Sequence, residues 1–390
     1  MSRLRKIVTW LSALTVLAII AVLVFLPAFF DGQVNKVRPH GPYPVSAQAR
    51  ALHDRLIIGD LHADPLLWKR DLVQRQTRGQ VDIPRLIEGN VALQVFTAVT
   101  KSPSGLNYEQ NDAEAWDDIT TLSVAQLWPP RTWTSLFERA VYQAEKLHRF
   151  EAASGGRLRI IRSNSDLETL LADRAAGTKV VGGILGIEGA HPLEGDIANL
   201  QRLQDEGYRL IGLQHFFDND LGGSLHGAGG GGLTEFGRAV VEAVENRGLI
   251  LDVAHSSQTV VRDVLAMTDM PIVVSHTGIY SYCETPRNLP DALMRAVAEA
   301  GGVVGIGFWA DVTCDDSPAG VAGAIVAAID LLGEDAVSLG SDYDGTVTVG
   351  FDASEMAALT QALIDTGLSE GQIAKVMGGN MVRVLRARLD

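Results

Sequence analysis

Histidine and carboxylate side chains recur in this sequence at the ends of short apolar runs. The residues at these positions are His62, Asp64, Glu188, His215, His255, His276 and Asp342. Imidazole and carboxylate groups are the ligands that zinc and similar divalent metals accept. So many donors would over-coordinate one ion, whereas two ions that share a carboxylate would be satisfied. The pattern therefore predicts a two-metal hydrolytic site, in which the ions lie about 3.5–4 Å apart.

Each of these residues also has a plain structural interpretation. A histidine after a strand is often a hydrogen-bonded structural residue, and Glu188 could cap the segment that follows it. Asp342, in "GSDYDG", could be a turn former, as Asp344 is expected to be. These alternatives do not explain why the same residue types recur at strand ends. The other histidines (His40, His53, His148, His191 and His226) do not share that position.

Eight β-rich apolar runs could position these side chains. They cover residues 55–60, 91–99, 179–189, 208–216, 248–256, 271–278, 301–309 and 336–345. Continuous apolar runs are typical of parallel strands that are buried on both faces. Helical patterns separate the runs; the segment 234–248, for example, opens with a Thr cap and ends with Gly. Region 100–150 is longer than a simple crossover and is interpreted as an elaborated loop that contains a helix.

This alternation of strands and helices predicts an α/β fold, a (β/α)8 TIM barrel of the metal-dependent hydrolase type. A doubly wound sheet is the alternative. In a TIM barrel the carboxyl ends of all strands meet at one mouth, where active sites lie. The barrel prediction therefore brings the histidines and carboxylates together.

The N-terminal part of the chain has a different character. Residues 7–30 contain no charge and are long enough to cross a bilayer, which needs about 20 apolar residues. Arg3, Arg5 and Lys6 precede this run, which keeps the N-terminus in the cytoplasm. The predicted organisation is a cytoplasmic N-terminus (1–6), an uncleaved transmembrane helix (7–30), a linker (31–50) and a catalytic barrel (51–390). The barrel would then be extracytoplasmic, and periplasmic in a Gram-negative cell.

Composition narrows the class of protein. The chain has 390 residues, of which 46% are hydrophobic and 21% charged, so it can bury a sizeable core. The formal net charge of −14 and the lack of a basic stripe exclude a nucleic-acid-binding protein. The two cysteines, Cys283 and Cys314, are either a disulfide, which an oxidising compartment favours, or two separate buried thiols.

Seven segments in a fixed order resemble a known family. They are "HAD", "GIEGAHPL", "GLQHFFDND", "LTEFGRAVVEAVENRGLILDVAHSS", "PIVVSHTG", "TPRNLPDALM" and "GSDYDG". Together they resemble the membrane dipeptidase (renal dipeptidase) family of zinc metallopeptidases, in the amidohydrolase-like superfamily, from about residue 52 to the end. The resemblance implies two Zn²⁺ ions. The first would bind His62, Asp64 and Glu188, and the second Glu188, His255 and His276, with Glu188 and a water or hydroxide as bridges.

The same resemblance implies roles for the remaining site residues. His215 would contact the scissile group, Arg287 would bind the substrate carboxylate, and Asp342 would be the acid/base carboxylate. It also implies a disulfide between Cys283 and Cys314, and a homodimer. The expected activity is hydrolysis of dipeptides with a free C-terminal carboxylate, including those with a D-residue at the C-terminal position.

Two loops at the predicted mouth depart from the family pattern. The loop "GSLHGAGGGGLT" is unusually rich in glycine, and the stretch "TVTVGFDASEM" after Asp342 lacks the expected proline. Because both loops border the mouth, these departures leave the substrate of the enzyme undetermined. The alternative function is a related binuclear amidohydrolase that acts on a lactam, a lactone or an N-acyl amino acid. A metal-free extracytoplasmic binding protein is a third interpretation, which metal content distinguishes from the other two.

Overall fold

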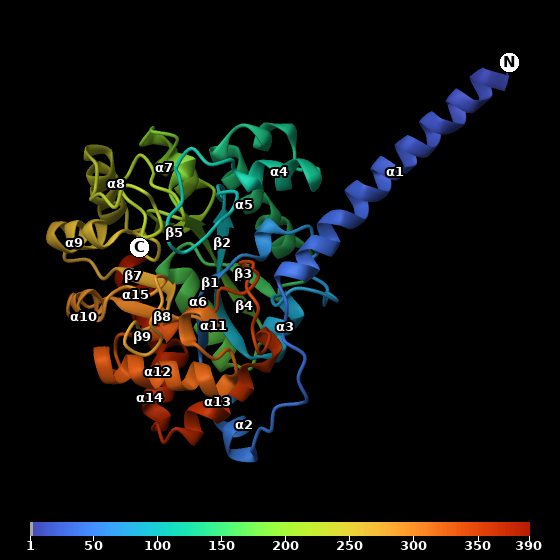
Figure 1. Ribbon diagram of the computed structural model, residues 1–390. Coiled ribbons are helices and arrows are strands. Elements are labelled where there is room, and N and C mark those ends of the chain that lie inside the picture. Colours follow the sequence, from blue (N-terminus) through green and yellow to red (C-terminus); the bar gives the residue numbers. More distant parts are fainter. Residues whose placement is uncertain (1–2) are drawn as a thin grey trace.

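A closed ring of eight parallel strands forms the centre of the computed structural model, which describes residues 3–390 except the side chains of residues 4, 6 and 16–24 (Figure 1). β2 pairs with both β1 and β4, and β9 pairs with β1, so the ring closes. The prediction of a (β/α)8 barrel is confirmed, with a strand in each of the eight apolar runs. The strands are β1 (Ile58–Ala63), β2 (Val91–Val99), β4 (Val181–Glu188), β5 (Tyr208–Gly212), β6 (Ile250–Asp252), β7 (Val273–Thr277), β8 (Val303–Ile306) and β9 (Val337–Leu339).

One short strand was not predicted from the sequence. β3 (Leu158–Ile160) pairs only with the first residues of β4. β6 and β9 are equally short but lie in longer apolar runs, whereas Arg157, Arg159 and Arg162 interrupt the apolar residues around β3. No continuous apolar run therefore marks this strand.

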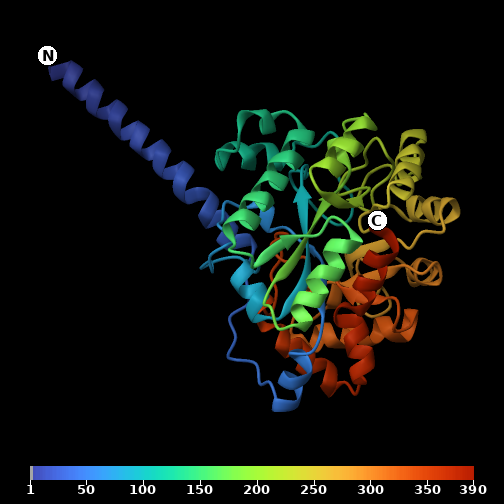
Figure 2. The same cartoon turned by 180° about the vertical axis from the view of Figure 1, so that it is seen from behind.

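Helices surround the barrel (Figures 1 and 2). One begins at the predicted cap, where the Thr234 hydroxyl accepts a hydrogen bond from the Gly237 amide. Another is capped in the same way by Ser135, whose hydroxyl accepts a hydrogen bond from the Glu138 amide. The α-helices are α1 (Arg3–Val34), α2 (Ala47–His53), α3 (Ile83–Glu88), α4 (Asp118–Ala125), α5 (Leu136–Ala153), α6 (Asn164–Ala175), α7 (Ala198–Asp205), α8 (Glu235–Asn246), α9 (Gln258–Met267), α10 (Asp291–Glu299), α11 (Ala310–Thr313), α12 (Pro318–Leu332), α13 (Met356–Asp365), α14 (Glu370–Ala374) and α15 (Asn380–Arg388). The short helical turns are η1 (Pro65–Leu67), η2 (Pro130–Trp133), η3 (His191–Leu193), η4 (Ala353–Glu355) and η5 (Lys375–Gly379).

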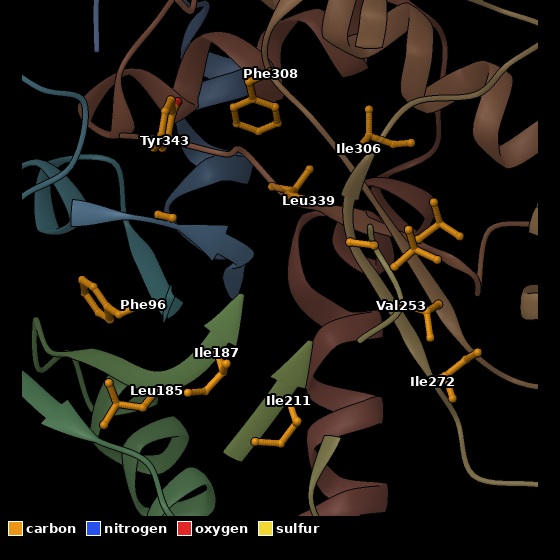
Figure 3. Packing of buried hydrophobic residues seen from close by; sticks show 14 of the residues in the cluster. Phe96, Leu185, Ile187, Ile211, Val253, Ile272, Ile306, Phe308, Leu339 and Tyr343 are labelled. Atoms are coloured by element: carbon orange, nitrogen blue, oxygen red, sulfur yellow. The ribbon is translucent and has the colours of Figure 1, made fainter. Parts of the chain in front are cut away.

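Every residue of β1, β2 and β4 is buried, as the continuous apolar runs predicted. Side chains of β2 enter two apolar clusters: Leu93 and Val95 belong to one, and Phe96 and Ala98 to another. Figure 3 shows side chains of the second cluster from several strands. Packing on both sides of the barrel wall fixes where each strand ends, and so where its polar residues lie.

α1 extends away from the barrel as a single rod, with the N-terminus at its far end (Figure 1). Within the described part of the chain, no helix combines the length and the apolar character that a bilayer span requires. The transmembrane helix predicted over 7–30 is therefore not confirmed. The side chains of residues 16–24 within it lie outside the described residues.

The segment predicted as a linker packs against the barrel. Asp31 and Asn35 are buried, and Val37 forms a parallel β-bridge with Val349 in the loop after β9. Its three prolines suggested a free segment, but its backbone has hydrogen-bonding partners on the barrel surface.

Candidate active site

The histidines and carboxylates predicted at strand ends converge at the carboxyl end of the barrel. His62 and His276 lie in β1 and β7, and Glu188 is the last residue of β4. Asp64, His215, His255 and Asp342 follow β1, β5, β6 and β9 within three residues. All seven side chains are buried. The structure therefore brings together every residue of this predicted set.

Glu188 lies at the centre of the group. Its Oε1 atom is 3.2 Å from His255 Nε2 and 3.4 Å from the Nε2 atoms of both His62 and His276. Its Oε2 atom is 3.5 Å from His215 Nε2. One carboxylate thus faces four imidazole nitrogens, the arrangement that a bridging ligand requires.

Asp64 and Asp342 complete the group on the other side of His62. His62 Nε2 lies 3.5 Å from Asp64 Oδ2 and 3.8 Å from Asp342 Oδ1. The Thr97 hydroxyl donates a hydrogen bond to Asp64 Oδ1 and so fixes that carboxylate. A side chain at Gly345 would collide with the Asp342 carboxylate and approach Asp64 Oδ2 to 3.0 Å, so glycine keeps this space open.

Burial and mutual repulsion shift the protonation equilibria of the group. Burial raises the pKa of Glu188 and raises that of Asp342 well above its ordinary value. Burial and the nearby Arg287 cation lower the pKa of His255 well below its ordinary value. Burial alone would lower the pKa of His62, but Glu188 and Asp64 outweigh it and raise that pKa to about 10. Three buried carboxylates thus require positive charge between them.

These donors suit divalent metal ions. Three overlapping groups have ligand atoms within 4.8 Å of one another: His62, His276 and Asp342; Glu188, His215 and His255; and His62, Asp64 and Glu188. His255 Nε2 and His276 Nε2 are 3.0 Å apart, a close approach of lone pairs that a shared cation relieves. Neutral imidazole and carboxylate are the forms that bind such ions.

Ser275 and Asp252 orient the imidazoles of His62 and His276 through their Nδ1 atoms, on the side of each ring away from Glu188. Ser275 Oγ donates a hydrogen bond to Asp252 Oδ2 over 2.6 Å, and it lies 2.9 Å from His276 Nδ1 and 3.3 Å from His62 Nδ1. Because this hydroxyl proton is already donated, Oγ accepts from the two Nδ1–H groups. The Nε2 atoms of both rings then face the carboxylates and are the ring atoms that a metal ion would contact.

We did not predict Asp252 or Ser275 from the sequence. Asp252 lies inside the predicted run 248–256 and is the last residue of β6. A carboxylate directly after the apolar residues 249–251 could have been recognised as a further strand-end candidate. Nothing in the pattern marks Ser275.

The Ser275→Ala variant is expected to bind metal about 10- to 100-fold more weakly, the usual cost of losing an outer partner of a metal ligand. Competition with a chromogenic chelator measures this affinity. The Ser338→Ala variant, which changes a buried hydroxyl of β9 that has no hydrogen-bond partner among the described residues, is the control. Equal metal affinity in the wild type and both variants would contradict the orienting role.

His215 differs from the other imidazoles in its hydrogen bonding. Its Nδ1 atom lies 2.9 Å from the Lys101 carbonyl oxygen. Because a carbonyl only accepts, Nδ1 carries a proton, and Nε2 can donate a hydrogen bond only in the imidazolium form. In the neutral form, Nε2 offers a lone pair beside Glu188 instead.

Arg287 is buried next to the metal-ligand candidates. Its Nη2 atom donates to the His276 carbonyl oxygen over 2.9 Å and lies 3.3 Å from His255 Nε2. Its Nη1 atom has no hydrogen-bond partner among the described residues. The segment that carries Arg287 is tied down by a disulfide between Cys283 and Cys314. A buried guanidinium with an unused donor is suited to bind a carboxylate.

A cavity of about 640 Å³ connects these groups with solvent, and its lining includes Glu188, His215, Arg287 and Asp342. Tyr108 and Trp309, which the sequence did not single out, also line it, and the Trp309 indole donates a hydrogen bond to the Tyr108 hydroxyl. Tyr108 comes from the elaborated loop between β2 and α4. No apolar period or motif marks a loop residue of this kind.

Comparisons with known proteins give one consistent result. The model of the membrane dipeptidase family, peptidase family M19, matches residues 46–389. Dipeptidase aclJ of Aspergillus oryzae is 28% identical over 362 residues, which cover 85% of this chain and 78% of the relative. The crystal structure of dipeptidase AC, a metallopeptidase of family M19, is 25% identical, with a TM-score of 0.69 over 86% of this chain and 99% of the other.

A further similar structure carries a ligand. It is a metallopeptidase from Rhodobacter sphaeroides, bound to a phosphinate mimic of the dipeptide L-Ala-D-Ala. It is 24% identical, with a TM-score of 0.68 over 85% of this chain and 99% of the other chain. At this identity, the likeness concerns the fold.

Proposed function

Because this chain belongs to the membrane dipeptidase family, peptidase family M19, and is a metallo-dipeptidase, we propose that it hydrolyses dipeptides with a free C-terminal carboxylate at a two-zinc centre. The observation that carries the proposal is the position of Glu188, whose two carboxylate oxygens face the Nε2 atoms of four histidines. His62 and Asp64 would hold one ion and His255 and His276 the other, with Glu188 between them. Bound zinc supplies a water nucleophile at neutral pH and polarises the peptide carbonyl.

The remaining residues bind substrate and move protons. Arg287 presents its unused Nη1 donor to the C-terminal carboxylate of the substrate. His215, as an imidazolium, donates from Nε2 to the carbonyl oxygen as negative charge develops on it. Asp342 accepts the proton of the attacking water and returns it to the leaving amine. The raised pKa of Asp342 suits a carboxylate that must hold this proton.

A dipeptide panel on metal-loaded protein tests this proposal. We expect hydrolysis of Ala-Ala and no hydrolysis of its C-terminal amide, because the amide removes the charge that Arg287 binds. The panel includes L,L- and L,D-dipeptides; the dipeptide mimic bound by the Rhodobacter sphaeroides relative supports acceptance of the D-form. Hydrolysis of lactams, lactones or N-acyl amino acids without cleavage of dipeptides would favour the alternative amidohydrolase.

The Arg287→Ala variant is expected to raise KM for dipeptides about 10- to 100-fold without changing metal content, because a charge-assisted hydrogen bond to the carboxylate is lost. Steady-state kinetics and metal analysis measure the two quantities. Arg383→Ala, at an exposed arginine bonded to backbone carbonyls of residues 301 and 335, is the control. An unaltered KM would show that Arg287 does not bind the substrate carboxylate.

We further propose that the barrel works in an oxidising, extracytoplasmic compartment. The disulfide between Cys283 and Cys314 supports this location, because disulfides persist mainly outside the cytosol. The homodimer implied by the family resemblance stays a prediction, which light scattering of the purified protein tests.

A further inference from the structure

The segment at residues 31–43 lies ahead of the part that matches the family model, which begins at residue 46. It nevertheless forms part of the cavity mouth. Its Val37 is bridged to Val349 in the loop after β9. The Arg38 amide donates to the Val349 carbonyl over 2.8 Å, and the Val349 amide donates to the Lys36 carbonyl over 3.0 Å. The segment thus adds a short strand-like edge to this loop.

Side-chain hydrogen bonds hold the same two segments together. The Thr346 amide donates to Asn35 Oδ1 over 2.9 Å, and the Tyr43 hydroxyl donates to the Gly350 carbonyl over 2.7 Å. Gln80 Nε2 donates to the carbonyls of both Lys36 and Val347. These contacts fix the loop 345–350 along its length.

Buried ion pairs anchor the start of the segment. The Asp31 carboxylate, 1% exposed, lies 2.8 Å from Arg78 Nε and 3.2 Å from Arg70 Nε. Arg70 also pairs with Asp344 over 2.8 Å, two residues after Asp342. The segment is therefore held to the loop that carries the proposed acid/base carboxylate.

The fixed loop is a wall of the active-site cavity, since Thr346, Val347 and Thr348 line it together with Asp342. Arg38 lines the same cavity from the added segment. Among the described residues, Arg38 and Arg287 are the only arginine or lysine side chains in that lining. The cavity therefore presents two guanidinium groups, one buried beside the metal-ligand candidates and one near the surface.

Arg38 is held in place and still accessible. Its Nε and Nη2 atoms donate to Asp316 Oδ2 over 3.2 and 2.7 Å, while its side chain remains 60% exposed. Asp311 is the one exposed acid among the described residues that line the cavity, and it accepts a hydrogen bond from the Tyr108 hydroxyl over 3.4 Å. The orientation by Asp316 leaves Nη1 of Arg38 free of that carboxylate.

We propose that Arg38 is a specificity-determining residue that favours dipeptides with a second carboxylate, on a side chain, in addition to the one at Arg287. This inference rests on the proposed dipeptidase function. A guanidinium recognises a carboxylate through parallel N–H donors. Because the backbone of the segment is already fixed, binding of a substrate carboxylate to the Arg38 guanidinium costs little backbone conformational entropy.

The test compares acidic dipeptides with their neutral isosteres. kcat/KM is measured for Ala-Ala, for Glu-Ala against Gln-Ala, and for Ala-Glu against Ala-Gln. In the Arg38→Ala variant we expect the ratio of acidic to neutral substrate to fall about fivefold for at least one pair, the scale of a half-exposed ion pair. Ala-Ala should change less than about twofold, and Arg38→Lys should retain part of the preference.

Arg55→Ala is the matched control, because Arg55 is also 60% exposed and paired with one carboxylate, that of Glu370, but precedes β1 at the opposite end of the barrel. If Arg38→Ala lowered kcat/KM equally for all five substrates, Arg38 would have only a structural role. An unchanged ratio of acidic to neutral substrate would also overturn the inference. If the wild type cleaves no dipeptide, the proposed function fails separately. Calorimetric binding of Glu-Ala and Gln-Ala to both proteins then still decides the role of Arg38.

Discussion

Replacing Glu188 by glutamine is expected to remove most of the bound metal and to lower kcat/KM on the order of 10³-fold or more. Oε1 of Glu188 faces the Nε2 atoms of His62, His255 and His276 within 3.2–3.4 Å, and Oε2 faces His215 Nε2. An amide has no negative charge and only one oxygen acceptor, so it cannot serve both halves of the site. Atomic emission spectrometry after dialysis measures the metal, and steady-state hydrolysis of Ala-Ala measures kcat/KM.

Comparison with the His255→Ala variant distinguishes the proposed bridging ligand, Glu188, from a proposed ligand of one ion only, His255. This variant is expected to lose about one metal equivalent and most activity, whereas Glu188→Gln affects both ions. Glu284→Gln, which changes an exposed carboxylate bonded to the Tyr280 hydroxyl, is the control and should retain metal and activity. Full metal content in Glu188→Gln would refute the bridging assignment.

The barrel was predictable because one kind of signal was repeated. Eight continuous apolar runs, the pattern typical of parallel strands, predicted eight such strands, and the structure has a strand in each run. The convergence of the polar residues then follows from topology, because the carboxyl ends of barrel strands meet at one mouth. Residues as far apart as His62 and Asp342 could therefore be placed together without any pairwise contact signal.

What the sequence did not show depends on contacts between distant segments. Ser275 orients His62 and His276, yet an isolated serine in a strand has no distinguishing pattern. The prolines of the segment 31–43 are typical of a linker. In the structure, however, hydrogen bonds to residues some 300 positions away hold this segment against the barrel. Asp344 was expected to be a simple turn former. It has the positive φ of such a turn, but it is also fully buried and paired with Arg70.

The second large effect is expected from Asp342→Asn, which should lower kcat about 10²- to 10⁴-fold, the usual contribution of a general acid–base group. The amide cannot accept the proton of the attacking water. Metal content should be largely retained, because Glu188 and the other proposed ligands remain. KM should change little, because Arg287 still binds the substrate carboxylate. Stopped-flow or steady-state kinetics on metal-analysed protein measures these quantities.

Asparagine is the substitution of choice because the backbone at this position is left-handed. Asp342 and Asp344 have φ of 60° and 66°, and asparagine tolerates this region better than other non-glycine residues. The same change at Asp344 is therefore a matched control within one loop. Asp344→Asn removes one of the two buried carboxylates that pair with Arg70 and leaves only Asp31, so it should lower the free energy of unfolding by about 3 kcal/mol, while Asp342→Asn should not. If both variants lost stability and kcat in parallel, Asp342 would be a loop-forming residue like its neighbour, and the proton-transfer role would pass to another group at the mouth.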